Sequence, residues 1–100
     1  MSVTIHIPSP LRPLVGEQDT VIVEREGTVA RPLGTVGEIL HDLSDLYGEL
    51  GKHLFSEDGN LRNFVNVYVN DEDIRYQDGE QTALKSGDTV SIVPAIAGGH

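Results

Sequence analysis

The residues best suited to chemistry on another molecule stand at the end of the chain, in Ala95-Ile96-Ala97-Gly98-Gly99-His100. Because glycine has no Cβ, Gly98 and Gly99 fit extended and left-handed backbone alike. They follow a β-branched run closed by Pro94, and this apolar tail has nothing of its own to fold onto. We predict one folded domain over residues 1–94 and a flexible tail over residues 95–100 that is presented to another protein.

The rest of the sequence matches no familiar catalytic arrangement. Cysteine is absent, which excludes disulfides, thiolate zinc sites and a cysteine nucleophile. His6, His41 and His53 are scattered without the spacing of a zinc motif, and no serine stands in a nucleophile elbow. The acidic run 71–73 lacks the glycine and the later glutamate of a calcium loop, so we interpret it as a solvated hairpin turn. We predict no catalytic site, no metal site and no bound cofactor.

Length and charge narrow the class of protein further. One hundred residues are enough for a single domain with its own core. A formal charge of −9 argues against nucleic acid, and it indicates either a basic partner or ordinary solubility. No stretch reaches the roughly 20 apolar residues of a membrane span, and no signal peptide is recognisable. We predict a cytoplasmic protein that binds neither nucleic acid nor membrane.

Alternation of apolar and polar side chains, rich in β-branched residues, predicts the strands. They cover residues 3–7, 20–24, 64–69, 74–76 and 89–93. Prolines at positions 8, 10 and 13 end the first strand, because proline has no ladder donor. We interpret 24–34 as an irregular insertion, 81–84 as a single helical turn and 86–88 as a tight turn.

One amphipathic helix is predicted in the middle of the chain. Thr35 and Glu38 fit a capping box, in which the threonine accepts from the amide three residues on while the glutamate reaches back. The apolar stripe that follows has helical spacing and consists of Val36, Ile39, Leu40, Leu43, Leu46 and Tyr47. We expect Gly48 and Gly51 to end this helix, and the stretch with Leu50, Leu54 and Phe55 that follows can hold one more helical turn.

The order of these elements is strand, strand, helix, strand, strand, short turn, strand. A single helix can cover one face of a single sheet. The connection that contains the helix must cross the sheet. It can do so if the first and last strands lie parallel to each other in the centre of the sheet. The fold class is therefore α+β, a ubiquitin-like β-grasp in which a mixed sheet of about five strands packs on one main helix.

With strand order and tail in place, the chain resembles the ThiS/MoaD family of sulfur-carrier proteins. The resemblance rests on Leu11-Arg12-Pro13, on residues 64–75, on Ser86-Gly87-Asp88 and on the tail segment 92–99. It covers nearly the whole chain. The strand and tail segments together make it specific, whereas two glycines near a terminus alone would be a weak signal.

The resemblance implies a carrier rather than an enzyme. In this family an ATP-dependent enzyme related to ubiquitin activators adenylates the terminal glycine carboxylate, which is then converted to a thiocarboxylate. Carried over to this sequence, the reactive carboxylate belongs to Gly99, while Ala97 and Gly98 thread into the partner. The absence of cysteine agrees with this role, because no internal thiol can attack the acyl adenylate.

For the members that serve cysteine synthesis, the family implies two further partners. A pyridoxal-phosphate cysteine synthase receives the sulfur on activated serine, and a zinc metallopeptidase of the JAMM type cuts the cysteinyl adduct free. ATP, pyridoxal phosphate and zinc would then belong to the partner enzymes. Alternative destinations are molybdopterin, thiamine and thiolated tRNA. A ubiquitin-like modifier joined to lysines through Gly99, or an interaction module with an inert tail, also remain open.

Two features depart from the family pattern. His100 follows Gly99, so cleavage between them must precede any reaction of the Gly99 carboxylate. This histidine is a precursor residue removed by a metallopeptidase, a remnant of a purification tag or a functional terminal residue. The stretch 24–34 is longer than the family usually has between its second strand and its helix.

One docking surface is also predicted. Val93 should point away from the core, and Phe64 should share its outward face if the two strands pair in register. Together they would form a small apolar patch for the activating enzyme. The alternative is scattered surface apolar residues, which are normal for any protein.

Overall fold

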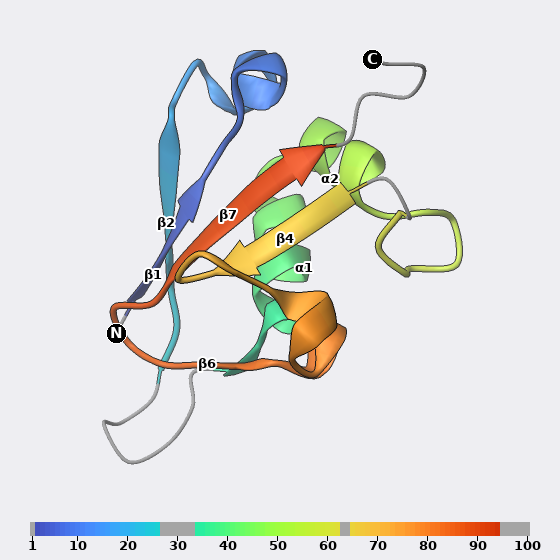
Figure 1. Cartoon of the computed structure of the whole chain (residues 1–100). Helices are drawn as coiled ribbons and strands as arrows, with labels where there is room; N and C mark the ends of the chain where they lie inside the picture. The colour runs from blue at the N-terminus through green and yellow to red at the C-terminus, as the bar shows by residue number, and fades with distance from the viewer. Residues whose placement is uncertain (1, 27–33, 63–64, 95–100) are drawn as a thin grey trace.

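The computed structural model describes residues 2–26, 34–62 and 65–94 of the chain. Within them, five strands form one mixed sheet in the order β2-β1-β7-β4-β5. Their bounds are β1 (Ser2–His6), β2 (Thr20–Glu24), β4 (Val65–Val69), β5 (Glu72–Asp73) and β7 (Thr89–Pro94). The first and last strands pair in parallel at the centre, as predicted, and the other pairs are antiparallel (Figure 1). This is the β-grasp arrangement that the sequence predicts.

The helices cover one face of this sheet (Figure 1). They are α1 (Val36–Leu46) and α2 (Gly48–Leu54), accompanied by three short 3-10 segments, η1 (Ser9–Val15), η2 (Ile74–Tyr76) and η3 (Gly79–Gln81). A separate pair of short strands, β3 (Gly34–Thr35) and β6 (Ala83–Leu84), lies at the start of α1. The predicted insertion between β2 and α1 falls mostly in residues 27–33, which lie outside the described residues.

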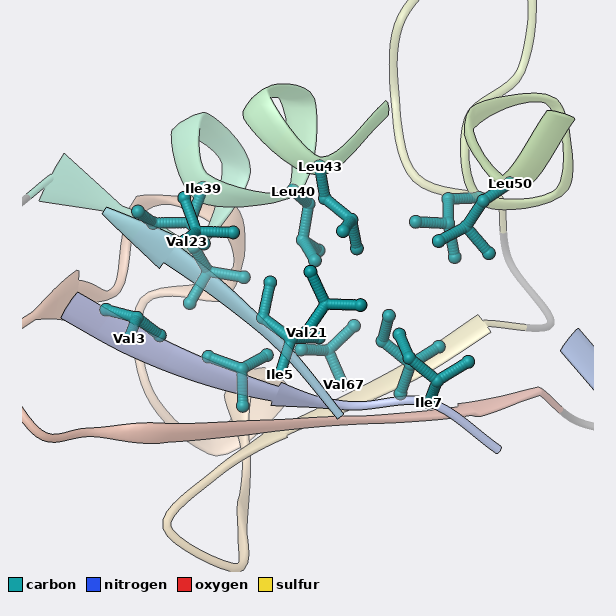
Figure 2. Packing of buried hydrophobic residues seen from close by; sticks show 14 of the residues in the cluster. Val3, Ile5, Ile7, Val21, Val23, Ile39, Leu40, Leu43, Leu50 and Val67 are labelled. Atoms are coloured by element: carbon teal, nitrogen blue, oxygen red, sulfur yellow. The ribbon is translucent and has the colours of Figure 1, made fainter. Parts of the chain in front are cut away.

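The core lies between the sheet and α1, with α2 closing one end (Figure 2). Alternate residues of each strand point inward, as period-two patterning requires. The side chains buried most completely include Val3, Ile5, Ile7, Ile39, Leu40, Leu43, Leu50, Leu54 and Val67. The packing therefore unites residues from both ends of the chain in one cluster.

The predicted start of the main helix is confirmed. Thr35 Oγ1 accepts from the Glu38 amide at 3.2 Å, and Glu38 Oε1 accepts from the Thr35 amide at 2.9 Å. Leu46 does not belong to the buried stripe, however, because α1 ends there and its side chain is 62% exposed.

The main helix ends at Leu46, with Tyr47 as its cap, directly before Gly48, as predicted, and the further helical segment expected before residue 56 is α2. The predicted role of Gly51 is wrong, because this residue lies inside α2. A Cβ on Gly51 would stand 2.5 Å from the Ser44 Cβ, so this glycine allows the two helices to approach closely. Close packing between α1 and α2, rather than the end of a helix, explains why residue 51 is a glycine.

Two predictions for residues 74–84 are also wrong. Residues 74–76 form η2 instead of a returning strand, because strand pairing stops at Asp73, whose carboxylate accepts from the Arg75 amide. The single helical turn predicted for 81–84 lies earlier, as η3, and Ala83 and Leu84 pair with β3.

Candidate functional site

The candidate site is the carboxyl end of β7, because the tail 95–100 follows directly from it. Ala97, Gly98, Gly99 and His100 lie outside the described residues, so the geometry concerns the place from which they start. Here Pro94 lies opposite Val65 and Val93 opposite Asn66 in the antiparallel pairing with β4. The tail therefore continues from a central strand of the sheet.

The parallel pairing of β7 with β1 stops just before this point. It runs from Thr4 and Thr89 to His6 and Ser91. Continued by one more step, the ladder would require amide donors from Pro8 and Pro94, and proline has none. The Pro8 carbonyl accepts instead from the Leu11 amide of η1 at 2.9 Å. Two prolines at the same level thus end the ladder where the tail begins.

The segment after β1 is held beside this end of the sheet by η1. Leu11 is buried in the core, and Arg12 Nε donates to the Ile7 carbonyl at 3.0 Å. Pro13 lies within the same 3-10 segment, which Gly16 closes in a left-handed conformation with φ 66°. The Leu11-Arg12-Pro13 motif therefore turns the chain away after β1.

The opposite end of β7 is fastened by the other motif residues. Gly87 adopts φ 88°, and its amide donates to the Ser2 carbonyl at 3.0 Å. Asp88 accepts from the Lys85 amide at 2.8 Å and from Asn70 Nδ2 at 3.1 Å. Asn70 in turn accepts from the Thr89 amide at 3.0 Å. These residues join β1, β4 and β7 at the end remote from the tail.

Among the predicted site residues, Val93 is the one that the structure describes. Its side chain is 45% exposed, whereas Val90 and Ile92 are buried, which confirms that it points away from the core. Phe64, the other half of the predicted docking patch, lies outside the described residues. The patch itself remains a prediction.

Sequence reasoning missed other exposed apolar side chains. They are Ile22, Leu46 and Tyr76, which are 59%, 62% and 85% exposed. A signal existed for Ile22, because the inward neighbours Val21 and Val23 place it on the opposite face of its strand. For Tyr76 no such signal existed, since its segment was predicted as a strand.

The acidic turn differs from its prediction at one residue. Asp73 is only 7% exposed, and its carboxylate accepts from Arg75 Nη2 at 2.7 Å and from the Arg75 amide at 2.8 Å. The hydrogen bonds from the Arg75 side chain and then from its amide hold the pKa of Asp73 below its ordinary value. This carboxylate is therefore structural rather than solvated.

The remaining polar candidates do not gather into a site. His6, His41 and His53 are exposed, and His41 stacks on Phe55 with ring centroids 4.0 Å apart. Across the described ranges, no three His, Cys, Asp or Glu side chains are placed to hold one metal ion. Within that same part of the chain, no helix has the length and apolar character needed to cross a bilayer.

The described residues define a class by their fold, the ubiquitin-like β-grasp proteins, and the tail starts from the central strand β7. The model of the ThiS family matches residues 5–99, and the chain belongs to that family. The match takes in nearly all of the strands, both helices and the paired glycines of the tail.

Individual members of the family are similar to this chain over nearly its whole length. The sulfur carrier protein CysO of Mycobacterium tuberculosis is 42% identical over 101 residues, covering 99% of this chain and 100% of the relative. CysO in a crystal structure of the Amycolatopsis orientalis BexX/CysO complex is 40% identical, with a TM-score of 0.77 over 97% of this chain and 99% of that one. The crystal structure of M. tuberculosis CysO gives 40% identity and a TM-score of 0.74, over 94% and 99%. The protein is accordingly a carrier rather than an enzyme.

Proposed function

We propose that this protein carries sulfur as a thiocarboxylate on Gly99 and delivers it in cysteine biosynthesis. The observation that carries the proposal is full-length similarity to CysO together with a Gly-Gly tail that continues from the central strand β7. Carriage by a tail needs a rigid domain for recognition and an acyl end without a side chain. The described domain and the sequence of the tail meet these two needs.

The chemistry proceeds in two steps once Gly99 has a free carboxylate. A carboxylate oxygen attacks the α-phosphorus of ATP, forming the acyl adenylate and releasing pyrophosphate. Sulfide then attacks the acyl carbon and expels AMP, which leaves the thiocarboxylate. Neither step changes an oxidation state, and both occur on the adenylating enzyme. This chain contributes the carboxyl carbon of Gly99, to which the sulfur is attached.

His100 must be removed before the first step, because an amide bond at Gly99 leaves no carboxylate there. We assign this cleavage between Gly99 and His100 to a zinc metallopeptidase of the JAMM type, acting in the cytoplasm with the other partners. The same class of enzyme would later release the cysteinyl adduct formed on a pyridoxal-phosphate cysteine synthase.

Docking on the adenylating enzyme is assigned to Val93 and Phe64. Val93 lies one residue before the last residue of β7, so a partner that contacts it is close to the start of the tail. We expect the Val93→Asp, Phe64→Asp double variant to slow adenylation by raising KM. Tyr76→Asp is the matched control, since Tyr76 is also exposed and lies on another part of the fold. Unchanged adenylation kinetics in the double variant would refute the docking patch.

A second candidate function is protein modification through Gly99. One similar protein is Small archaeal modifier protein 3 of Haloferax volcanii, which is 43% identical over 65% of this chain and 70% of that relative. In that case the activated Gly99 would be attacked by a lysine amine rather than by sulfide. An inert tail on an interaction module is the third reading.

Intact-mass spectrometry separates these readings. The full chain is incubated with ATP, an adenylating enzyme, a JAMM metallopeptidase and sulfide. Loss of His100 followed by exchange of one oxygen for sulfur supports the carrier, and conjugates on lysine support the modifier. An unchanged mass supports the inert module. Adding the cysteine synthase with activated serine then tests the destination, because cysteine formation must depend on the thiocarboxylated chain.

A further inference from the structure

The outer strand β2 presents an uncovered edge of the sheet. In the order β2-β1-β7-β4-β5 it has a partner on one side, and within residues 2–26, 34–62 and 65–94 no strand pairs with its other side (Figure 1). Its sequence, Thr20-Val21-Ile22-Val23-Glu24, contains neither proline nor lysine. Natural sheets usually protect such edges with charges, prolines or bulges, because an exposed apolar edge is a template for strand addition.

The register shows which backbone groups face outward. The Ile7 amide donates to the Asp19 carbonyl at 2.8 Å, and the pairing continues as Ile5 with Val21 and Thr4 with Ile22. In an antiparallel ladder, alternate residues direct their N–H and C=O groups toward the partner. Those of Val21 and Val23 therefore face β1, while those of Thr20 and Ile22 face away from the sheet.

Apolar side chains flank this edge on both faces. Val21 and Val23 point into the core beneath α1, so Ile22 lies on the other face of the sheet, where it is 59% exposed (Figure 2). Leu46, at the end of α1, is similarly exposed. The groove between this edge and α1 is lined by Ile22, Val23, Glu24, Asp42, Asp45 and Leu46.

Acidic side chains along the groove indicate the charge of the segment that would bind there. Asp42 and Asp45, both on α1, place two carboxylates beside the groove, and Asp42 pairs with Arg25 at 3.3 Å. Asp45 is exposed one helical turn away from that pair. The chain as a whole has a formal charge of −9. Complementarity of charge therefore favours a basic occupant.

We propose that the edge of β2 is a docking site for an extended segment of a partner protein in which apolar and basic residues alternate. The segment adds to the sheet as a strand, with its amides and carbonyls bonded to those of Thr20 and Ile22. Its apolar side chains pack beside Ile22. Its basic side chains, on the other face, extend over Leu46 toward Asp42 and Asp45, because long basic side chains cover apolar surface with their stems.

A second copy of this chain fits the edge poorly. Each copy has a formal charge of −9 and supplies no alternating basic side chains from its own β2, so a second copy lacks the charge complementarity that favours a basic segment. The site also lies on β2 rather than at the carboxyl end of β7. A partner bound there would leave the start of the tail accessible.

The test uses the full chain, labelled with ¹⁵N, and a synthetic peptide of alternating lysine and valine with blocked ends. We expect chemical-shift changes centred on the amides of Thr20 and Ile22, at an ionic strength of about 0.15 M. The matched control peptide has the same sequence with N-methyl groups on alternate residues. It keeps the charge and side chains but lacks donors for a ladder, so it should not bind.

Two variants remove the apolar contacts independently. Ile22→Lys and Leu46→Lys should each weaken binding about tenfold, because each loses apolar burial and adds a like charge. Tyr76→Lys makes the same change of charge at an exposed site elsewhere and should stay within about twofold of the parent. Thermal melts confirm that each variant is folded, and either of the two groove variants suffices if the other fails to fold.

Several outcomes would overturn the proposal. Equal weakening by Tyr76→Lys, or equal binding of the N-methylated peptide, would reduce the effect to general attraction between opposite charges. Shift changes that avoid β2 would place the peptide elsewhere. Sedimentation of the free chain as a dimer that Ile22→Lys converts to a monomer would assign the edge to a second copy.

Discussion

At its amino end β7 is held by hydrogen bonds to three other segments, whereas at its carboxyl end two prolines remove the donors that would continue the ladder. The first end uses Gly87, Asp88 and Asn70, and the second uses Pro8 and Pro94. The strand β7 is therefore held by hydrogen bonds at its amino end, and it has no β1 partner at its carboxyl end, where the tail starts. This difference assigns the two ends separate roles, one in stability and one in presentation.

The largest expected effect comes from the core that supports both ends. Leu43 is completely buried, so Leu43→Ala should lower the free energy of unfolding by about 2 to 5 kcal/mol. A denaturant titration measures this. If the roles are separate, the fraction that remains folded should still be adenylated at the parent rate. A melt unchanged by the substitution would contradict the core assignment.

The next effect concerns the contact between α1 and α2. Gly51→Ala should cost about 1 to 3 kcal/mol, because the new Cβ would overlap the Ser44 side chain. Gly48→Ala is the matched control, since a Cβ there meets nothing within 4 Å and should change stability by less than about 1 kcal/mol. Equal gains in the two variants, which the higher helix propensity of alanine alone would produce, would show that close packing against Ser44 does not explain Gly51.

A third pair of variants compares the two ends of β7 directly. Asp88→Ala removes two hydrogen bonds and should cost about 1 to 2 kcal/mol, without changing adenylation. Pro94→Ala restores a donor on the side without a β1 partner and should change stability by less than about 1 kcal/mol. If Pro94→Ala proves the more destabilising of the two, the comparison between the ends is wrong.

The smallest effect is the pH dependence of the Asp73 and Arg75 pair. Because the pKa of Asp73 is lower in the folded chain than its ordinary value, the pair stabilises the fold at pH above about 4. This contribution is lost as the pH falls through the folded pKa. Asp73→Asn should therefore be less stable than the parent at neutral pH, and denaturant midpoints should converge in acid. A constant difference across the pH range would exclude the ionised pair as the cause.

Most of the fold follows from local patterns in the sequence. Thr20 to Glu24 is rich in β-branched residues and forms β2, and the Thr35 and Glu38 capping box marks the start of α1. Segments that depend on tertiary context were predicted less well. Residues 74–76 form η2, and Gly51 lies inside α2, where the absence of a Cβ leaves room for the Ser44 side chain. Neither the turn bonded by Asp73 nor the helix contact has a local signal.

The candidate site divides in the same way. The outward direction of Val93 follows from strand alternation and is confirmed. The roles of Gly98, Gly99 and His100 come from the resemblance to a family and remain proposals. The proposed reaction uses the catalytic residues of a partner enzyme, so this sequence contains no catalytic motif that would predict it. The joint stop of the ladder at Pro8 and Pro94 requires the register of two strands that are remote in sequence.

The proposed sulfur carrier bears its sulfur on the carboxyl carbon of Gly99. The most direct test compares a chain ending at Gly99 with the chain that retains His100, each incubated with the adenylating enzyme, ATP and sulfide but no peptidase. Intact-mass spectrometry should show exchange of one oxygen for sulfur in the chain ending at Gly99 and an unchanged mass in the other. An unmodified chain ending at Gly99, or sulfur gained with His100 still attached, would contradict the claim.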